Sequence, residues 1–378
     1  MSQRRRTILL ASASIGSGHM QAAKAIETAW REAFPADEVI VADSMDGGSS
    51  YVQHVLKETY LKMIAVTPFL YDTLYHLSQG LSPGSRGQSL FSWFMQKTMQ
   101  QLYSRHQPDL VICTHPFPCA AMAYLKRHHR ISAPLAGVIT DFAVHGTWIY
   151  PETDLYTVAA DELKAELVGR GIAADRIDAC GIPVQPPLPP AAADYQKLGL
   201  QPGLPVVMLM GGGLGLGPLR EVLLALDSVA VPLQIAAVAG NNSGLQQELS
   251  AAAAGLRHQT TVFGYTPYVR ELMQAAALLI TKPGALTISE ALAAGLPMLL
   301  FQSFPGQETD NAAFLLERGA AGWFEPDGAE QIVRLLTDSG ERRQALAAIN
   351  RIARPASAKA AVAAIAARLL PAGQAAGM

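Results

Sequence analysis

Residues 7–30 read TILLASASIGSGHMQAAKAIETAW, and this stretch indicates the fold class. An apolar run typical of a buried strand leads through the glycine-rich loop Gly16–His19 into a segment whose apolar residues recur at helical spacing. Residues 205–226, PVVMLMGGGLGLGPLREVLLAL, repeat this order, with Pro218 suited to a first helical position. Each half of the chain is therefore expected to begin with a strand, a glycine-rich loop and a helix.

Further short apolar runs alternate with helical patterns in both halves, which predicts parallel sheets covered by helices. The proline-rich segment PVQPPLPPAAADY, residues 183–195, separates the halves and is typical of a linker. We predict an α/β protein with two doubly wound, Rossmann-like domains facing a cleft. Ligands of such sheets bind at the carboxyl ends of the strands. The further apolar runs are EVIVAD, DLVICT, LAGVIT, LQIAAVAG, ALLIT and PMLLF.

Composition narrows the class of protein. The chain has 378 residues, half of them apolar, which is enough for two sizeable cores. Its net charge of -2 argues against a surface built mainly for nucleic acid. Cys113, Cys119 and Cys180 are too irregularly placed for a disulfide framework or a zinc site, so we interpret them as buried, reduced thiols of a cytoplasmic protein. No apolar run approaches the roughly 18 residues of a spanning helix, so we expect a soluble or membrane-surface protein.

The glycine loops do not fit the common nucleotide motifs. GxGxxG would need glycine at position 21, which holds Gln21, and the second loop has Leu216 or Pro218 where a third glycine should stand. GxxxxGK[ST] is absent as well. A dinucleotide-dependent dehydrogenase is therefore disfavoured.

Residues 281–321, TKPGALTISEALAAGLPMLLFQSFPGQETDNAAFLLERGAA, carry the most information about function. The strand ALLIT ends in Lys282 and the Pro283–Gly284 loop, and a helix follows. Backbone amides at a helix N-terminus, together with one fixed cation, can hold a diphosphate.

This segment resembles the C-terminal domain of the family 28 glycosyltransferases, which include the peptidoglycan lipid II glycosyltransferase and the monogalactosyldiacylglycerol synthases. GSGHMQAAKAI is similar to the N-terminal glycine-histidine motif of the diacylglycerol branch. ITDFAVHGTWIYPETDLYTVAADE, followed by GIPV, is similar to its central TD-x-x-x-H-x-x-W segment. The resemblance covers nearly the whole chain, and residues 50–105 match least certainly.

The resemblance implies a GT-B fold and an inverting transfer of a hexose from a UDP-sugar to diacylglycerol, giving a β-glycosyl lipid. It implies an N-terminal acceptor-binding domain at 1–182, a linker at 183–204 and a UDP-sugar-binding domain at 205–353. The helix at 354–378 either crosses back to the first domain or simply ends the chain. Glycine-loop amides, a helix dipole and Lys282 suffice to stabilise departing UDP, so no metal or other cofactor is expected.

The resemblance also suggests catalytic and acceptor residues. His19 matches the motif histidine, which is either the base or an acceptor-site residue; a histidine that packs beside the loop is the structural alternative. Asp141 either orients His19, takes the proton itself or caps the next turn. His145 and Trp148 are expected to shape the acceptor pocket, with simple core packing as the alternative for Trp148.

On the donor side, Glu290 matches the glutamate that the family uses for the ribose hydroxyls, although Thr287 and Glu290 equally fit a capping box. Gln307 and Glu308 match a loop that contacts sugar hydroxyls, or form a solvated turn. Thr266 lies where the family's backbone meets uracil, beside Tyr265 and Val269. The other donor residues implied are Gly18, Gly212, Gly213, Asn241, Lys282, Pro283, Gly284, Ala285, Leu286 and Thr287. Two departures concern donor details: Ala285 replaces the second glycine of the usual PGG, and TPY replaces a commoner acidic segment.

Residues 51–105 interleave nine aromatic side chains with five cations. Such a mixture suits either a surface that dips into an anionic bilayer or a pair of helices with aromatic core faces. A lipid acceptor favours the first, so we expect a cytoplasmic enzyme peripherally bound to the inner face of the cell membrane. The aromatic residues are Tyr51, Tyr60, Phe69, Tyr71, Tyr75, Phe91, Trp93, Phe94 and Tyr103, and the cations are Lys57, Lys62, Arg86, Lys97 and Arg105.

Other functions stay open at this point. Within enzymes, the chain could be a lipid-linked N-acetylglucosamine transferase of the peptidoglycan type or a UDP-sugar epimerase. From a different class, it could be a nucleotide-sugar sensor without turnover. The TDFAVHGTW segment and the aromatic residues favour the diacylglycerol branch, and the presence of both His19 and the PGQE loop argues against a sensor.

Overall fold

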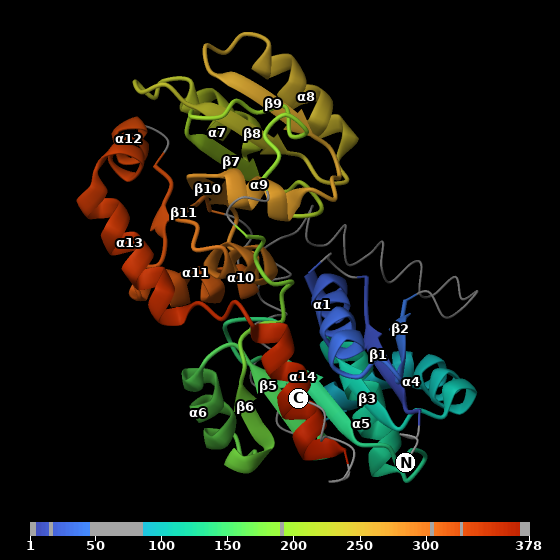
Figure 1. Ribbon diagram of the computed structural model, residues 1–378. Coiled ribbons are helices and arrows are strands. Elements are labelled where there is room, and N and C mark those ends of the chain that lie inside the picture. Colours follow the sequence, from blue (N-terminus) through green and yellow to red (C-terminus); the bar gives the residue numbers. More distant parts are fainter. Residues whose placement is uncertain are drawn as a thin grey trace. The chain divides into compact units, whose positions relative to one another are not determined.

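The computed structural model describes residues 5–14, 18–45, 86–189, 193–302, 306–325 and 328–370; for residues 86–94 it describes the backbone only. The chain divides into two compact units, one of residues 1–185, 305–307 and 356–378 and the other of residues 186–304 and 308–355. Each unit contains one parallel sheet covered by helices (Figure 1). The linker expected at 183–204 therefore contributes to both units.

In the first unit, the described strands pair in the order β2-β1-β3-β4-β5-β6, all parallel. β1, β3, β4 and β5 are almost entirely buried, which explains their continuous apolar sequences. The elements are β1 (Thr7–Ser12), α1 (Gly18–Ala33), β2 (Glu38–Asp43), α4 (Arg86–His106), β3 (Leu110–Cys113), α5 (Pro116–Arg127), β4 (Leu135–Val138), η1 (Gly146–Trp148), β5 (Leu155–Val158), α6 (Asp161–Gly169), η2 (Ala174–Arg176), β6 (Ile177–Ala179) and α14 (Ser357–Leu369).

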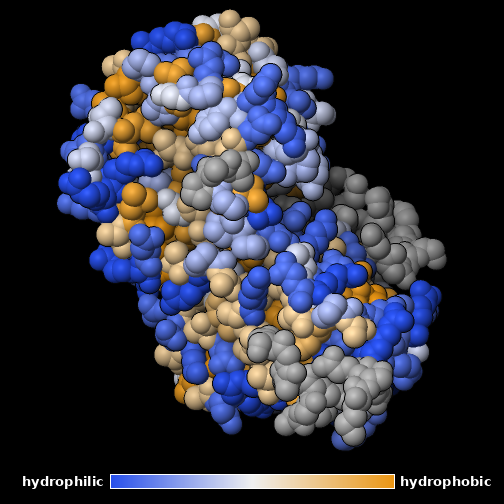
Figure 2. All heavy atoms as spheres, in the orientation of Figure 1, coloured by the Kyte–Doolittle hydropathy of each residue, from blue (hydrophilic) through white to orange (hydrophobic). Residues whose placement is uncertain are grey.

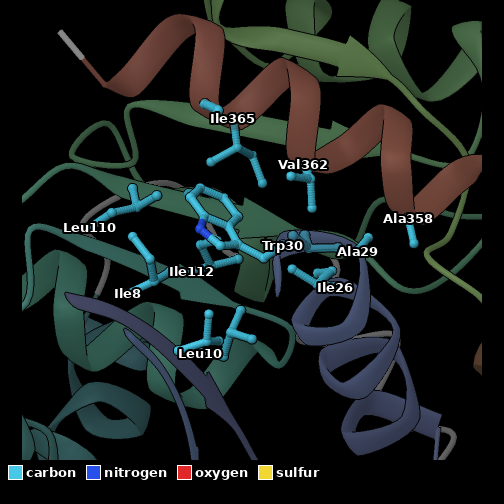
Figure 3. Close-up of a cluster of buried hydrophobic side chains, with 14 of the residues drawn as sticks. Ile8, Leu10, Ile26, Ala29, Trp30, Leu110, Ile112, Ala358, Val362 and Ile365 are labelled. Carbon is cyan, nitrogen blue, oxygen red and sulfur yellow. The ribbon is translucent and has the colours of Figure 1, made fainter. Parts of the chain in front are cut away.

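The C-terminal helix α14 lies in this first unit, against α1. Its side chains Val362 and Ile365 share one buried cluster with Trp30 of α1 and with Ile8 of β1 (Figure 3). Ion pairs of Lys359 with Glu32 (2.9 Å) and of Arg368 with Asp178 (2.7 Å) flank the cluster. The last described helix thus completes the core of the unit in which the chain begins.

In the second unit the described strands pair in the order β12-β11-β10-β7-β8-β9, again all parallel. α7 begins at Leu219 with Pro218 as its N-cap, one residue later than expected. The elements are β7 (Val206–Met210), α7 (Leu219–Leu226), β8 (Gln234–Val238), α8 (Ser243–Ala253), β9 (Gln259–Phe263), α9 (Val269–Ala275), β10 (Leu278–Thr281), α10 (Ala285–Ala293), β11 (Met298–Leu300), α11 (Gln307–Glu317), β12 (Gly322–Trp323), α12 (Ala329–Thr337) and α13 (Ser339–Ile352).

Both sheets contain a point where the strand order reverses. In the first it lies between β1 and β3, and in the second between β7 and β10. Open α/β sheets bind ligands outside the carboxyl ends of the strands at such a point. These two edges are therefore where functional residues are expected.

The described surface carries large hydrophobic side chains only at scattered positions. On the face shown in Figure 2, hydrophilic side chains are interspersed with smaller hydrophobic areas. The exposed large hydrophobic residues among those described are scattered: Val168, Leu214, Leu224, Tyr265 and Trp323. No described helix combines the length and the apolar character that crossing a bilayer requires. Of the aromatic and basic segment at 51–105, residues 51–85 and the side chains of 86–94 lie outside the described residues. The prediction of a membrane-dipping surface is therefore untested.

The three cysteines are buried free thiols, as expected from their spacing.

Candidate functional site

His19 lies where the strand order of the first sheet reverses, between β1 and β3. This residue is the second of α1, which follows β1, and its ring reaches the end of the neighbouring strand β3. Nδ1 of His19 lies 3.0 Å from the Thr114 carbonyl oxygen and 2.8 Å from Thr140 Oγ1. Thr114 Oγ1 donates in turn to the His19 carbonyl oxygen at 3.0 Å. Residues after β1, β3 and β4 thus converge on this imidazole.

These contacts determine which nitrogen of His19 carries the proton. The Thr114 carbonyl can only accept, so Nδ1 is the protonated nitrogen and Nε2 carries the lone pair. Burial lowers the pKa of His19 to about 4, and the hydrogen bond to the Thr114 carbonyl opposes this shift. At neutral pH the ring is therefore an uncharged base with a fixed tautomer.

Asp141 lies close to His19 along the chain, since it follows Thr140 directly. β4 ends at Val138, so Asp141 stands in the loop after the strand rather than at its end, and it is buried at 9% exposure. The orientation of His19 Nδ1 comes from Thr114 and Thr140. The choice between His19 and Asp141 as the base stays a prediction.

Of the two expected acceptor residues, His145 precedes η1 and Trp148 ends it. His145 is its N-cap: Nδ1 of His145 accepts from the Thr147 amide at 3.3 Å and lies 2.7 Å from Thr147 Oγ1. Trp148 is 1% exposed, and its carbonyl accepts from the Tyr156 hydroxyl at 2.8 Å. Trp148 is therefore packed in the core, which was the structural alternative for this residue. A role in acceptor binding stays a prediction for both residues.

Sequence reasoning missed His115. This residue follows Thr114 at the end of β3 and caps α5, with its Nδ1 accepting from the Phe117 amide at 3.1 Å. Its ring lies against that of His19, with centroids 4.5 Å apart and planes at 73°. A usable signal was present, because polar residues placed directly after a buried strand, as in DLVICTHP, lie at the ligand edge of such a sheet.

The GSGH loop is described in part. Gly18 and His19 form the first residues of α1, whereas residues 15–17 lie outside the described part of the chain. The donor role expected for Gly18 is untested.

At the corresponding edge of the second sheet, the glycine loop after β7 packs against neighbouring loops. Gly212 has φ +70°, and a methyl group there would approach Lys282 Cε to 3.2 Å. A methyl group on Gly240 would lie 2.6 Å from the Gly213 oxygen. The Asn241 amide donates to that same oxygen at 2.9 Å. The structure thus brings Gly212, Gly213, Asn241 and Lys282 together.

Lys282 follows β10 and is ion-paired with Glu308 of α11; both side chains are largely buried. Asn311, one turn further along α11, donates from Nδ2 to the Pro283 carbonyl oxygen at 3.2 Å. A methyl group on Gly284 would lie 3.6 Å from Lys282 Nζ. Helix α11 therefore fixes both the cation and the Pro-Gly loop.

Helix α10 begins at Ala285, and Gly284 is its N-cap. The first backbone hydrogen bond of the helix runs from the Ile288 amide to the Gly284 carbonyl oxygen, at 3.0 Å. The amides of Ala285, Leu286 and Thr287 precede it, so they can face an anion. The N-capping alternative for Thr287 and Glu290 is wrong, because Thr287 already lies inside the helix.

Glu290 is a partly buried residue in the middle of α10. Burial raises its pKa to about 7, while the charge of Arg270 on α9 acts in the opposite direction. Burying a carboxylate in this way costs stability, and perturbed carboxylates of this kind cluster at functional sites.

Thr266 lies in the turn between β9 and α9, where its hydroxyl accepts from the Tyr268 amide at 3.2 Å. Tyr265 beside it is 62% exposed. An exposed aromatic ring next to a rigid turn can stack on a base. Gln307, the first residue of α11, precedes Glu308. Contacts of these residues with uracil and with sugar hydroxyls stay predictions.

The described residues contain no group of three or more His, Cys, Asp or Glu side chains arranged to hold a metal ion.

Two family models match separate parts of the chain. Residues 19–184 match the family model of monogalactosyldiacylglycerol (MGDG) synthase, and residues 206–368 match that of the glycosyltransferase family 28 C-terminal domain. The processive diacylglycerol beta-glucosyltransferase of Bacillus cytotoxicus is 32% identical over 92% of this chain and 90% of its own. The protein of the same name from Bacillus mycoides is 33% identical, with the same coverage.

Among solved structures, MurG of Acinetobacter baumannii superposes with a TM-score of 0.60 at 15% identity, covering 94% of this chain and 98% of its own. The glycosyltransferase SnogD of Streptomyces nogalater reaches 0.61 at 19% identity, covering 96% and 100%. These likenesses show the fold alone and confirm the GT-B class. Together with the sequence relatives, they lead to one assignment: the chain belongs to glycosyltransferase family 28, in the branch of the diacylglycerol glycosyltransferases and monogalactosyldiacylglycerol synthases.

Proposed function

We propose that this glycosyltransferase moves a hexose from a UDP-sugar to the free hydroxyl of diacylglycerol, with inversion at the anomeric carbon. The observation that carries the proposal is the identity of 32–33% with diacylglycerol beta-glucosyltransferases over about nine tenths of both chains. The names of these relatives favour diacylglycerol over a lipid-linked peptidoglycan precursor, and they favour a transferase over a sensor.

In the proposed mechanism, His19 is the base. Its Nε2 takes the proton of the acceptor hydroxyl as the hydroxyl oxygen attacks the anomeric carbon from the face opposite UDP. The bond from this carbon to the diphosphate breaks at the same time, and the electron pair leaves with UDP. The hydrogen bond from Nδ1 to the Thr114 carbonyl supports this role, because it orients the ring and stabilises the imidazolium that forms.

The leaving diphosphate would be held at the edge of the second sheet. The first-turn amides of α10, the loop around Gly212 and the ammonium of Lys282 supply positive potential there. A bound diphosphate would compete with Glu308 for Lys282, which would release Glu308 toward the sugar hydroxyls. Glu290 is proposed to accept from the ribose hydroxyls. We propose that these groups stabilise departing UDP without a metal or other cofactor.

Because diacylglycerol resides in bilayers, the enzyme must reach a membrane surface. We propose peripheral binding at the cytoplasmic face, supported by the aromatic and basic composition of residues 51–105. Vesicle co-sedimentation tests this: binding should increase with anionic lipid and fall with salt. Equal binding to neutral vesicles would refute the electrostatic part of the proposal.

The activity is tested with the full-length protein, diacylglycerol vesicles and UDP-glucose, UDP-galactose or UDP-N-acetylglucosamine in separate reactions. Mass spectrometry of the extracted lipids should show diacylglycerol carrying one or more hexoses with one UDP-hexose. Vesicles without diacylglycerol are the control. UDP binding without any lipid product would contradict the proposal and favour a sensor, and a product only from UDP-N-acetylglucosamine would favour the peptidoglycan-type alternative.

A further inference from the structure

His115 has no part in the mechanism above, yet its side chain is held firmly beside His19. It is 4% exposed at the N-cap of α5, and its Nδ1 accepts from the Phe117 amide at 3.1 Å. The rings of His19 and Phe117 pack against its ring at centroid distances of 4.5 Å and 4.8 Å, both edge-on. A helix cap and two ring contacts therefore fix the position of this imidazole.

The hydrogen bonds give the two histidines opposite tautomers. His115 Nδ1 accepts from a backbone amide, so its proton is on Nε2. His19 Nδ1 donates to the Thr114 carbonyl, so its Nε2 is unprotonated. That carbonyl belongs to the peptide bond that precedes His115. The cap that fixes His115 therefore also fixes the hydrogen-bond acceptor of His19.

We propose that His115 is a positioning residue for His19: its capped ring closes one side of the His19 imidazole, excludes water from it and keeps it an uncharged base with Nε2 available. This inference rests on the proposed role of His19 as the base. In this proposal His115 acts through its neighbour His19 and not on a substrate.

Electrostatics support the same arrangement. Burial lowers the pKa of His115 well below 6.5, and the nearby His19 lowers it further, because two adjacent imidazolium ions repel each other. Two acidic side chains stand on neighbouring segments: Asp141 after Thr140, and Asp43 at the end of β2, which accepts from the Ser14 amide at 3.0 Å. A carboxylate beside His19 would favour its charged form, whereas the His115 ring disfavours that form because it keeps water away from the imidazole.

Two substitutions of His115 distinguish the effect of its ring from the effect of its capping hydrogen bond. His115→Asn keeps a side-chain oxygen that can cap α5 but removes the ring, whereas His115→Phe keeps the ring but removes the cap. The pKa of His19 is measured by nuclear magnetic resonance titration of ¹³C-labelled imidazoles in the substrate-free, full-length protein, with His19→Gln used to assign the signal. His129→Asn, at an exposed residue with φ +54°, is the matched control.

We expect the pKa of His19 to rise from about 4 in His115→Asn and to stay near 4 in His115→Phe and in the control. The acid limb of the transfer rate should move upward by the same amount in His115→Asn. If the pKa of His19 is unchanged in His115→Asn, the proposal is overturned. If, in addition, only His115→Phe loses stability, His115 is no more than a helix cap. Because the titration needs no substrate, its result is independent of whether diacylglycerol is the acceptor.

Discussion

Replacing Glu290 with glutamine should stabilise the protein while it weakens nucleotide binding. Burial raises the pKa of this carboxyl from 4.5 to about 7 in the folded state. Between these values the folded protein holds a proton that the unfolded chain releases, so stability falls as pH rises through this window. At about 1.4 kcal/mol per pKa unit the full loss is about 3 kcal/mol, and the partial exposure of Glu290 reduces it to about 1–2 kcal/mol.

Glutamine has the same shape and no charge to bury, so Glu290→Gln should be more stable than the parent at pH 8 and equal to it at pH 4.5. Differential scanning calorimetry at both pH values measures this. We expect the melting temperature of the second unit to rise by several degrees at pH 8, since about 1 kcal/mol corresponds to roughly 2–4 °C in a unit of this size.

Isothermal titration calorimetry should show UDP binding weakened about tenfold, the cost of losing a charged hydrogen-bond acceptor for the ribose. As pH falls below about 7, binding to the parent protein should weaken more than binding to the variant, because only the parent gains a proton at residue 290. A variant that is less stable at pH 8, or that binds UDP as the parent does, would refute the reasoning for Glu290.

Three further substitutions, the first with a matched control, test the packing of both units and the diphosphate site. Gly217→Ala should destabilise the second unit by more than about 2 kcal/mol, because φ is +113° and the added methyl would meet the Phe301 ring at 2.2 Å. The control Gly203→Ala, where φ is +86° and the space around the residue is open, should cost only about 1 kcal/mol. Urea unfolding measures both losses, and equal losses would contradict the packing argument. Ile365→Ala should leave a cavity under α14 and cost about 2–5 kcal/mol in the first unit, so an unchanged calorimetric transition of that unit would show that α14 is not part of its core. Lys282→Met should weaken UDP binding at least tenfold at low salt and less at high salt, and equal affinity at low salt would remove Lys282 from the diphosphate site.

Much of the fold could be predicted because both sheets are buried on two faces. Strands such as Leu110–Cys113 and Leu278–Thr281 carry continuous apolar runs, and these are visible without any alignment. The edge strands β6, β9 and β12 were missed, because IDA, QTTVF and GW are short or polar. β5, LYTV, was also missed, since it lies inside the segment interpreted as an acceptor motif.

Residues of the candidate site could be predicted where they lie inside a continuous sequence motif. The resemblance selected His19 and Glu290, and the strand-loop-helix pattern selected Lys282. The structure adds the contacts between residues far apart in the sequence. The Lys282–Glu308 pair joins residues 26 positions apart, and the His19–His115 contact depends on β1 and β3 being neighbours. The capping interpretation of Thr287 failed because Gly284 already terminates the preceding loop, so the helix starts before Thr287.

If His19 carries out the proton chemistry of hexose transfer to diacylglycerol and the second unit holds the UDP-sugar, a substitution should separate the two functions. The most direct test measures glycolipid formation and UDP affinity on the same preparation of His19→Asn. We expect product formation to fall by about 10²–10⁴-fold and UDP affinity to stay within about twofold of the parent. Full transfer activity in this variant, or loss of UDP binding in parallel with activity, would contradict this expectation.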